Sequence, residues 1–195
     1  MARASLRDEI FEAGQAEFHE RGYTSTGIAG ITTRAAAPKG SFYNHFSSKE
    51  DLAVEALGAY AARQHLEVLE DPGLSPPDRL RAHFEFMADG IGGAPVINGC
   101  MIANFAAESS DETPLIREQI AAIYTMWSAL VARNLQEAAD MAGTGGADAE
   151  GLAWTLLDGY EGAAVRARAT RSAAPLRNFL ETTLPLALSA VSGSR

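Results

Sequence analysis

Apolar residues recur at helical spacing from the start of the chain. In the first segment Leu6, Ile10 and Phe18 fall on one face of a helix, and charged side chains occupy the opposite face. Gly22 suits the position just after a helix end, where the backbone often turns left-handed. The pattern therefore predicts an amphipathic helix that begins near Leu6 and ends before Gly22.

Two shorter helices are predicted next. Thr26 suits the N-cap of the first, which carries Ile31 on its apolar side. This helix is rich in glycine and threonine, which are poor helix formers, so packing must hold it. Pro38 is tolerated in the first turn of a helix but not in its interior. A third helix is therefore predicted to begin there and to include Tyr43.

The rest of the chain continues the helical pattern. Ser47 and Ser48 each precede an acid by three residues, which is the signature of a capping box at a helix start. Pro185 is expected to kink or end the last helix. Further helices are predicted over about residues 48–70, 76–89, 99–108, 114–141, 148–168 and 175–191, with a glycine-rich loop at 143–146. Convincing strand alternation is absent from the sequence, so the predicted fold class is all-α.

The composition excludes several classes of protein. With 47% hydrophobic and 21% charged residues, the 195-residue chain is typical of a folded globular protein. No apolar run approaches the ~20 residues of a membrane helix, and charged residues near the start argue against a secretory signal peptide. Cys100 is the single cysteine, which excludes an internal disulfide framework and a cysteine-rich zinc site. The expected location is the cytoplasm.

Charge is distributed unevenly along this acidic chain. The formal net charge is −9, yet the 29 residues from Arg21 to Lys49 contain no Asp or Glu. This segment, called here the acid-free segment, also contains Arg34 and both lysines of the chain, Lys39 and Lys49. Because exposed charges are screened beyond ~8 Å at physiological salt, local charge decides binding more than net charge does. The segregation indicates an acidic protein that meets a polyanion through one basic segment.

The three short helices are consistent with a DNA-binding domain. A tight turn between the second and third helices is typical of a helix-turn-helix, which lays its recognition helix in the major groove. Lys39 lies near the start of that helix, within reach of a phosphate or a guanine edge. Gly40 and Ser41 are small enough for the backbone to approach a duplex closely. Phe42 and Phe46 are the expected anchors of this helix to the core.

A family resemblance rests on the same residues. The run from Lys39 to Glu50 reads KGSFYNHFSSKE, and Tyr23, Thr26 and Ile31 precede it. These residues resemble the N-terminal domain of the TetR family of bacterial transcriptional regulators, and the match covers roughly residues 5–55. The chain departs from the family pattern in the turn before the third helix, where Ala36-Ala37 stands in place of Gly-Val.

A weaker resemblance covers the rest of the chain. Residues 99–108 read GCMIANFAAE, which is similar to a Gly-Cys-x-x-x-Asn-x-x-x-Glu signature in the ligand-binding domains of one branch of the family. Residues 161–163, followed by residues 168–176, resemble the penultimate-helix pattern near that branch's dimer interface. The resemblance implies about nine helices, a helix-turn-helix domain over residues 1–50, and an effector-binding and dimerisation domain over residues 51–195.

The resemblance also implies partners and contacts. The partners are double-stranded operator DNA with a palindromic sequence, a second copy of the chain, and a small-molecule effector; no cofactor is expected. Carried over position by position, the DNA contacts fall on Thr26, Thr33, Arg34, Lys39, Gly40, Ser41, Tyr43, Asn44, His45 and Lys49.

Aromatic and polar residues on the C-terminal helices are the candidates for an effector cavity. They are Phe84, Met87, Cys100, Asn104, Phe105, Tyr124, Trp127, Trp154, Asp158 and Glu161. Each apolar member can equally belong to the core, and Asp158 or Glu161 would orient a ligand. The expected effector is small and apolar or aromatic. The regulator is expected to be a repressor, and binding of the effector is expected to release it from DNA.

Two alternatives stay open at this point. Some relatives with the Gly-Cys signature respond to reactive compounds through the cysteine, which makes Cys100 a candidate sensor of electrophiles or oxidants. Its apolar neighbours and the lack of any lysine after Lys49 favour an unreactive buried thiol instead. The chain can also be a DNA-binding protein without a ligand. An enzyme is not expected, because the four histidines form neither an i, i+4 pair nor a catalytic-triad spacing.

Overall fold

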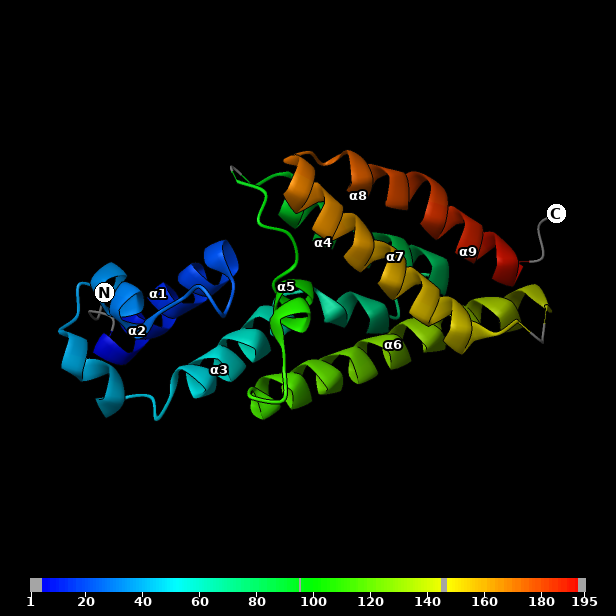
Figure 1. The fold of residues 1–195 in the computed structure, drawn as a ribbon. Helices are drawn as coiled ribbons and strands as arrows, with labels where there is room; N and C mark the ends of the chain where they lie inside the picture. The colour runs from blue at the N-terminus through cyan, green and yellow to red at the C-terminus, as the bar shows by residue number, and fades with distance from the viewer. Residues whose placement is uncertain (1–4, 95, 145–146, 193–195) are drawn as a thin grey trace. The chain divides into compact units, whose positions relative to one another are not determined.

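The computed structural model describes residues 5–94, 96–144 and 147–192, and over these residues every regular element is helical (Figure 1). The α-helices are α1 (Leu6–Arg21), α2 (Ile28–Arg34), α3 (Lys49–Ala62), α4 (Pro76–Gly92), α5 (Met101–Glu108), α6 (Pro114–Ala142), α7 (Ala149–Thr170), α8 (Ala174–Asn178) and α9 (Leu184–Ser192). Two 3₁₀ helices, η1 (Lys39–Asn44) and η2 (Leu66–Glu70), and a π-helical turn, η3 (Phe179–Thr183), complete the set. The all-α prediction is confirmed. Residues 145 and 146 of the predicted loop lie outside the described ranges.

The chain divides into two compact units. The first comprises Met1–Ala61 and Met101–Ala122, and so contains α1, α2, η1, most of α3, α5 and the beginning of α6. The second comprises Ala62–Cys100 and Ile123–Arg195, with α4, the remainder of α6 and the helices that follow. The predicted DNA-binding segment, residues 1–50, falls in the first unit.

A core of fully buried apolar side chains holds the short helices of the first unit together. Ile10 and Phe18 of α1, Ile31 of α2 and Phe42 of η1 are all completely buried. Because α2 has only seven residues and η1 only six, neither is stable alone, and burial of these side chains supplies the stability. This agrees with the expectation that packing holds the second helix.

The predicted N-cap of α2 is wrong by one residue. Gly27 occupies the N-cap position, with no side-chain hydrogen bond. Thr26 is buried instead, and its hydroxyl donates to the carbonyl oxygens of Gly22 at 2.7 Å and Glu17 at 3.2 Å. The last carbonyls of a helix have no intrahelical partner, so the Thr26 hydroxyl satisfies the C-terminal end of α1 rather than the N-terminal end of α2.

The turn between α2 and η1 is a Schellman motif with an alanine at the left-handed position. The N–H of Ala37 donates to the carbonyl of Thr32 and the N–H of Ala36 to that of Thr33, which are the two bonds that define the motif. Ala36 has a φ of 50°. A residue with a Cβ is strained there by about 1–2 kcal/mol, so Ala36 keeps the turn at a cost in stability.

We predict that Ala36→Gly stabilises the protein by about 1 kcal/mol, because glycine adopts the left-handed conformation without this strain. Urea unfolding followed by circular dichroism measures the change. Ala37→Gly is the matched control, since Ala37 has no positive φ, and it should leave stability unchanged or lower it. If the Ala36→Gly variant unfolds at a lower urea concentration than the wild type, Ala36 is not strained in this turn.

An aromatic cluster forms the centre of the second unit. Phe84 of α4 contacts Trp127 of α6, Tyr160 of α7 and Phe179 of η3, with ring centroids 5.1–6.3 Å apart. The Trp127 indole N–H donates to Nε2 of the fully buried His83 at 2.8 Å. Burial lowers the pKa of His83 to about 4, so His83 is neutral at physiological pH and serves as the acceptor for this buried donor.

The irregularity expected at Pro185 is present one turn earlier. The final helical segment is interrupted by η3, and the N–H of Leu184 donates to the carbonyl of Phe179, five residues back. Proline has no N–H to continue the regular ladder, and a π turn of this kind accommodates the missing donor. The segment therefore changes register between α8 and α9.

Candidate nucleic-acid interface and cavity

Helix η1 presents a polar face on an apolar base. Lys39, Gly40 and Asn44 are exposed, and Tyr43 is 64% exposed, although it is a large aromatic residue. On the opposite side Phe42 is fully buried. An exposed tyrosine beside an exposed lysine, on a helix anchored from below, is a surface suited to phosphate and base-edge contacts.

Two further anchors fix this helix. Phe46 is buried and packs against Phe42 with ring centroids 5.6 Å apart. Ser41 is also buried, and its hydroxyl donates to the carbonyl of Pro38 at 2.6 Å. The structure thus confirms Phe42 and Phe46 as anchors, and it places the Ser41 hydroxyl on the helix's own backbone.

Arg34, at the end of α2, is engaged within the first unit. Its guanidinium donates to Glu20 at 2.7 and 2.8 Å and to Glu17 at 3.0 Å. These hydrogen bonds lower the pKa of the Glu20 carboxyl. Thr33 is exposed beside it, with its hydroxyl donated to the carbonyl of Ala29. Arg34 therefore joins α2 to α1.

Lys49, at the start of α3, is directed inward. Its Nζ donates to the carbonyl oxygens of Tyr23 and Thr26, at 2.9 Å each, and lies 3.9 Å from the centroid of the Tyr23 ring. Burial lowers the pKa of this ammonium, and Glu108 nearby acts in the opposite direction. Lys49 therefore ties α3 to the connection between α1 and α2. The sequence had predicted a DNA contact for this lysine.

Glu108, the last residue of α5, also binds the connection between α1 and α2. Its carboxylate accepts the backbone N–H of Thr24 at 2.7 Å. Gly22 has a φ of 82°, and a Cβ built on it would lie 1.9 Å from the Glu108 carboxylate. Only glycine combines this backbone conformation with this close approach. The glutamate of the 99–108 signature thus has a structural contact that spacing alone did not indicate.

The ten residues expected to contact DNA therefore divide into two groups. Six lie on an exposed or half-buried surface of α2 and η1: Thr33, Lys39, Gly40, Tyr43, Asn44 and His45. The side chains of the other four are bonded within the first unit: Thr26, Arg34, Ser41 and Lys49. The two groups overlap, because Arg34 is exposed and the exposed Thr33 also bonds to the Ala29 carbonyl.

A cavity of about 210 Å³ lies between α6 and α7 in the second unit. Its lining consists of Tyr124, Trp154, Leu157, Asp158 and Glu161. Four of these were expected to contact an effector, and Leu157, one residue before Asp158, was not distinguished from a core leucine in the sequence. The two charged side chains in the lining are both acidic.

Glu161 is the most unusual polar group in this cavity. Its Oε1 accepts the Cys100 thiol at a sulfur–oxygen distance of 3.4 Å, and its Oε2 is buried without a hydrogen-bond partner among the described residues. Burial raises the pKa of Glu161 to about 7, and the nearby Asp158 acts in the same direction. Burial, together with Glu161, also raises the pKa of Tyr124.

The other expected effector contacts lie elsewhere. Phe84 and Trp127 belong to the aromatic cluster of the second unit, and Met87 is buried on α4. Phe105 packs against Phe18 and Tyr23 in the first unit. Asn104, its neighbour on α5, is buried as well. These residues do not line the cavity between α6 and α7.

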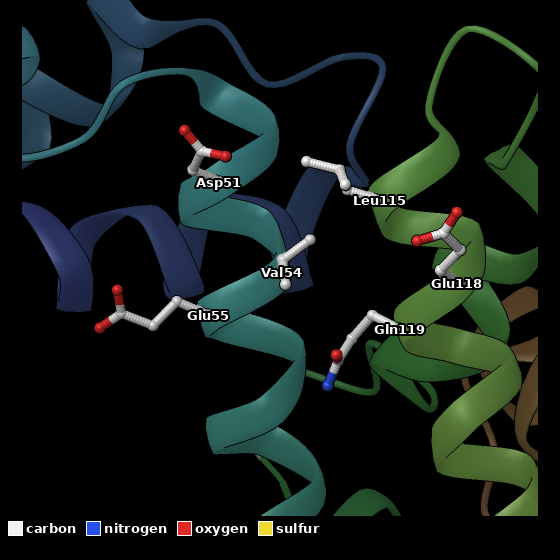
Figure 2. Close-up of a pocket in the computed structure, with 6 residues that line it drawn as sticks. All are labelled: Asp51, Val54, Glu55, Leu115, Glu118 and Gln119. Atoms are coloured by element: carbon white, nitrogen blue, oxygen red, sulfur yellow. The ribbon is translucent and has the colours of Figure 1, made fainter.

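A second, wider hollow separates α3 from the beginning of α6 within the first unit (Figure 2). It measures about 400 Å³, and Val54 faces Leu115 across it. Beside it the Glu50 carboxylate accepts the backbone N–H groups of Leu115 at 2.9 Å and Ile116 at 3.3 Å. Glu50 therefore satisfies two free donors at the N-terminus of α6, where negative charge is favourable.

Within the described ranges, no group of three His, Cys, Asp or Glu side chains is arranged to hold a metal ion. Among the described helices, none combines the length and hydropathy that crossing a bilayer requires.

Comparisons with known proteins agree with this architecture. The family model of "Bacterial regulatory proteins, tetR family" matches residues 10–56, and that of "Tetracyclin repressor-like, C-terminal domain" matches residues 76–183. The chain is 32% identical over 184 residues to the HTH-type transcriptional repressor DhaR of Mycobacterium sp. (strain GP1), covering 92% of this chain and 91% of the relative.

Two solved structures are similar over nearly the whole chain. The regulatory protein TetR from Rhodobacter sphaeroides superposes with a TM-score of 0.83 at 28% identity, covering 93% of this chain and 98% of that one. The reduced form of E. coli NemR gives a TM-score of 0.79 at 28% identity, covering 91% and 94%. The fold is a helix-turn-helix unit with a helical C-terminal domain, and the chain belongs to the TetR family of bacterial regulatory proteins.

We predict that Glu161→Gln changes how stability depends on pH. The Glu161 pKa is raised from 4.5 to about 7 in the folded state. The folded state therefore holds the proton more tightly, and the resulting stabilisation is present below pH 4.5 and lost as pH rises through 7. Relative to the wild type, the Gln variant should gain stability between pH 5 and pH 8, by up to about 3 kcal/mol.

Urea unfolding of both proteins at the two pH values measures this difference. Glu85→Gln, which replaces an exposed acid on α4, is the control and should track the wild type. A difference between the Gln variant and the wild type that is the same at both pH values would refute the raised pKa.

Proposed function

We propose that this protein is a transcriptional repressor that binds operator DNA through α2 and η1 and is released by a small molecule bound between α6 and α7. The observation that supports DNA binding most strongly is the exposed face of η1, with Lys39 and Tyr43, inside a segment free of acids. A protein with net charge −9 needs local positive charge of this kind to meet a polyanion. Such a role places its action in the cytoplasm, where bacterial DNA lies.

The DNA contacts that we propose are those on the exposed surface. Lys39 and Tyr43 would contact phosphates or base edges, with Thr33, Asn44 and His45 beside them and Gly40 allowing close approach. Arg34 and Lys49 would instead hold α2 and α3 in position, because both are already bonded within the first unit.

The repressor would act as a homodimer. Val165 of α7 and Leu186 of α9 are 47% and 64% exposed, and both helices belong to the second unit. Exposed apolar side chains on two helices are typical of a helical dimer interface. A two-fold dimer would place two copies of η1 in successive major grooves, about 34 Å apart or somewhat more, and would read a palindrome.

An effector-responsive function is favoured over a DNA-binding protein without a ligand. The cavity between α6 and α7 contains a buried carboxylate oxygen with no partner in the described residues, and leaving such an acceptor unpaired is costly unless something else binds it. The same helix α6 carries Tyr124 of the cavity and, at its N-terminus, the backbone groups bonded to Glu50. A ligand that shifts α6 would therefore act on α3, which follows the helix-turn-helix.

A sensing role for Cys100 is less well supported. The thiol is 3% exposed and donates to a carboxylate. A thiolate there would lie against negative charge in an apolar setting, which disfavours the reactive form. We also propose that the chain belongs to the branch with the Gly-Cys signature, where its cysteine would position Glu161.

We predict that Lys39→Ala and Tyr43→Ala each weaken operator binding about tenfold or more, because each removes a contact worth about 1–3 kcal/mol. Fluorescence anisotropy with the promoter fragment upstream of the protein's own gene measures this affinity. Tyr43→Phe separates loss of the hydroxyl from loss of the ring.

Arg177→Ala is the matched control, since Arg177 is an exposed cation on α8 in the second unit. It should bind the fragment as the wild type does. Circular dichroism confirms that each variant is folded. A folded Lys39→Ala variant with wild-type affinity would rule out the proposed interface.

A further inference from the structure

The residues that line the cavity between α6 and α7 indicate the chemical class of the effector. This inference rests on the proposed function, in which the cavity binds an effector. We propose that the cavity binds a small organic amine in its protonated form, with the ammonium on Glu161 Oε2 and an apolar or aromatic body against Tyr124 and Trp154. The sequence alone predicted only a small apolar or aromatic effector.

The charge of the lining selects against anions. Asp158 and Glu161 are the charged residues of the lining, and both are acids on α7, about one helical turn apart. Since α7 places residues three apart on the same face, both carboxyl groups point to one region. A carboxylate or phosphate ligand would meet two like charges, one at the buried Oε2 of Glu161 and one at the exposed Asp158, whereas a cation would meet two opposite ones.

The hydrogen bonds of Glu161 leave one position for a donor. The Cys100 thiol donates to Oε1 and orients the carboxyl group. Oε2 is buried and has no hydrogen-bond partner among the described residues, and the Tyr124 hydroxyl nearby lowers the pKa of the carboxyl. An ammonium carries three N–H donors and no acceptor, so it supplies what Oε2 lacks. In this arrangement Cys100 is a positioning residue rather than a sensor.

The aromatic side chains suit the same ligand. Tyr124 lines the cavity from α6, and Trp154, which is 41% exposed, lines its solvent side from α7. Aromatic faces attract organic cations as well as apolar groups. The volume of about 210 Å³ is below the ~300–1,000 Å³ of sites for drug-sized molecules. The ligand is therefore limited to an amine with about one ring or a short chain.

Binding of an amine is linked to the protonation of Glu161. Burial raises the pKa of Glu161 to about 7, and the titratable groups around it are Cys100, Tyr124 and Asp158. An ammonium favours the ionised carboxylate, so binding displaces the Glu161 proton. The ionised fraction rises about tenfold between pH 6 and pH 8 for a pKa of 7, and affinity should rise by the same factor.

Isothermal titration calorimetry with three matched probes tests this proposal on the full chain. The probes are benzylamine, benzyl alcohol and benzoate, which share a ring and differ in charge. Benzylamine should bind at least tenfold more tightly than benzyl alcohol at pH 8, and about tenfold more tightly at pH 8 than at pH 6. Benzoate should not bind.

Glu161→Gln should weaken benzylamine binding at least tenfold and remove its pH dependence, whereas Glu85→Gln, an exposed acid on α4, should bind as the wild type does. Circular dichroism establishes that both variants are folded. The proposal is overturned if benzoate or benzyl alcohol binds as tightly as benzylamine, if none of the three binds, or if folded Glu161→Gln binds benzylamine like the wild type.

Operator binding by the ligand-free protein should be measured on the same preparations. It distinguishes failure of the amine proposal from failure of the proposed function. A protein that binds its promoter fragment but no amine remains a repressor with a different effector. A protein that binds an amine but no promoter fragment contradicts the proposed function and leaves the chemistry of the cavity standing.

Discussion

Burial of Phe42 is the interaction on which the candidate DNA surface depends. Helix η1 has six residues in 3₁₀ geometry, which is too short to be stable by its own hydrogen bonds. Its position is set by Phe42, fully buried beneath it, and by Phe46 against that ring. The side chains that face outward, Lys39 and Tyr43 among them, are oriented because the opposite face is held.

Charges inside the first unit reinforce this arrangement. Arg34 joins α2 to α1 through two glutamates, and Lys49 joins α3 to the loop before α2 through two backbone carbonyls. Both belong to the basic residues of the acid-free segment, and in the interface that we propose they position the helices rather than contact the polyanion. The proposed interface is accordingly smaller than the sequence alone indicated, with Lys39 at its centre.

Much of the architecture could be predicted from the sequence, because helix periodicity and glycine or proline signals are local. The bounds of α1 and α6 lie within a residue or two of the prediction. Long-range contacts could not be predicted in this way. Glu108 meets Thr24 across 84 positions, and Cys100 meets Glu161 across 61. The inward ammonium of Lys49 also depends on a tertiary contact, and so does the burial of the Glu161 oxygen that has no partner among the described residues. The buried Thr26 hydroxyl bonds to carbonyls only four and nine residues away, but its inward direction is not visible in the helix periodicity.

The central claim is that local positive charge lets a protein of net charge −9 bind a duplex. The most direct test is the affinity of the purified protein for its own promoter fragment as a function of salt. If Lys39 of each protomer neutralises a phosphate, affinity should fall roughly tenfold between 50 and 200 mM salt for two released counterions. An affinity that does not change over this range, or no binding at 50 mM, would contradict the account.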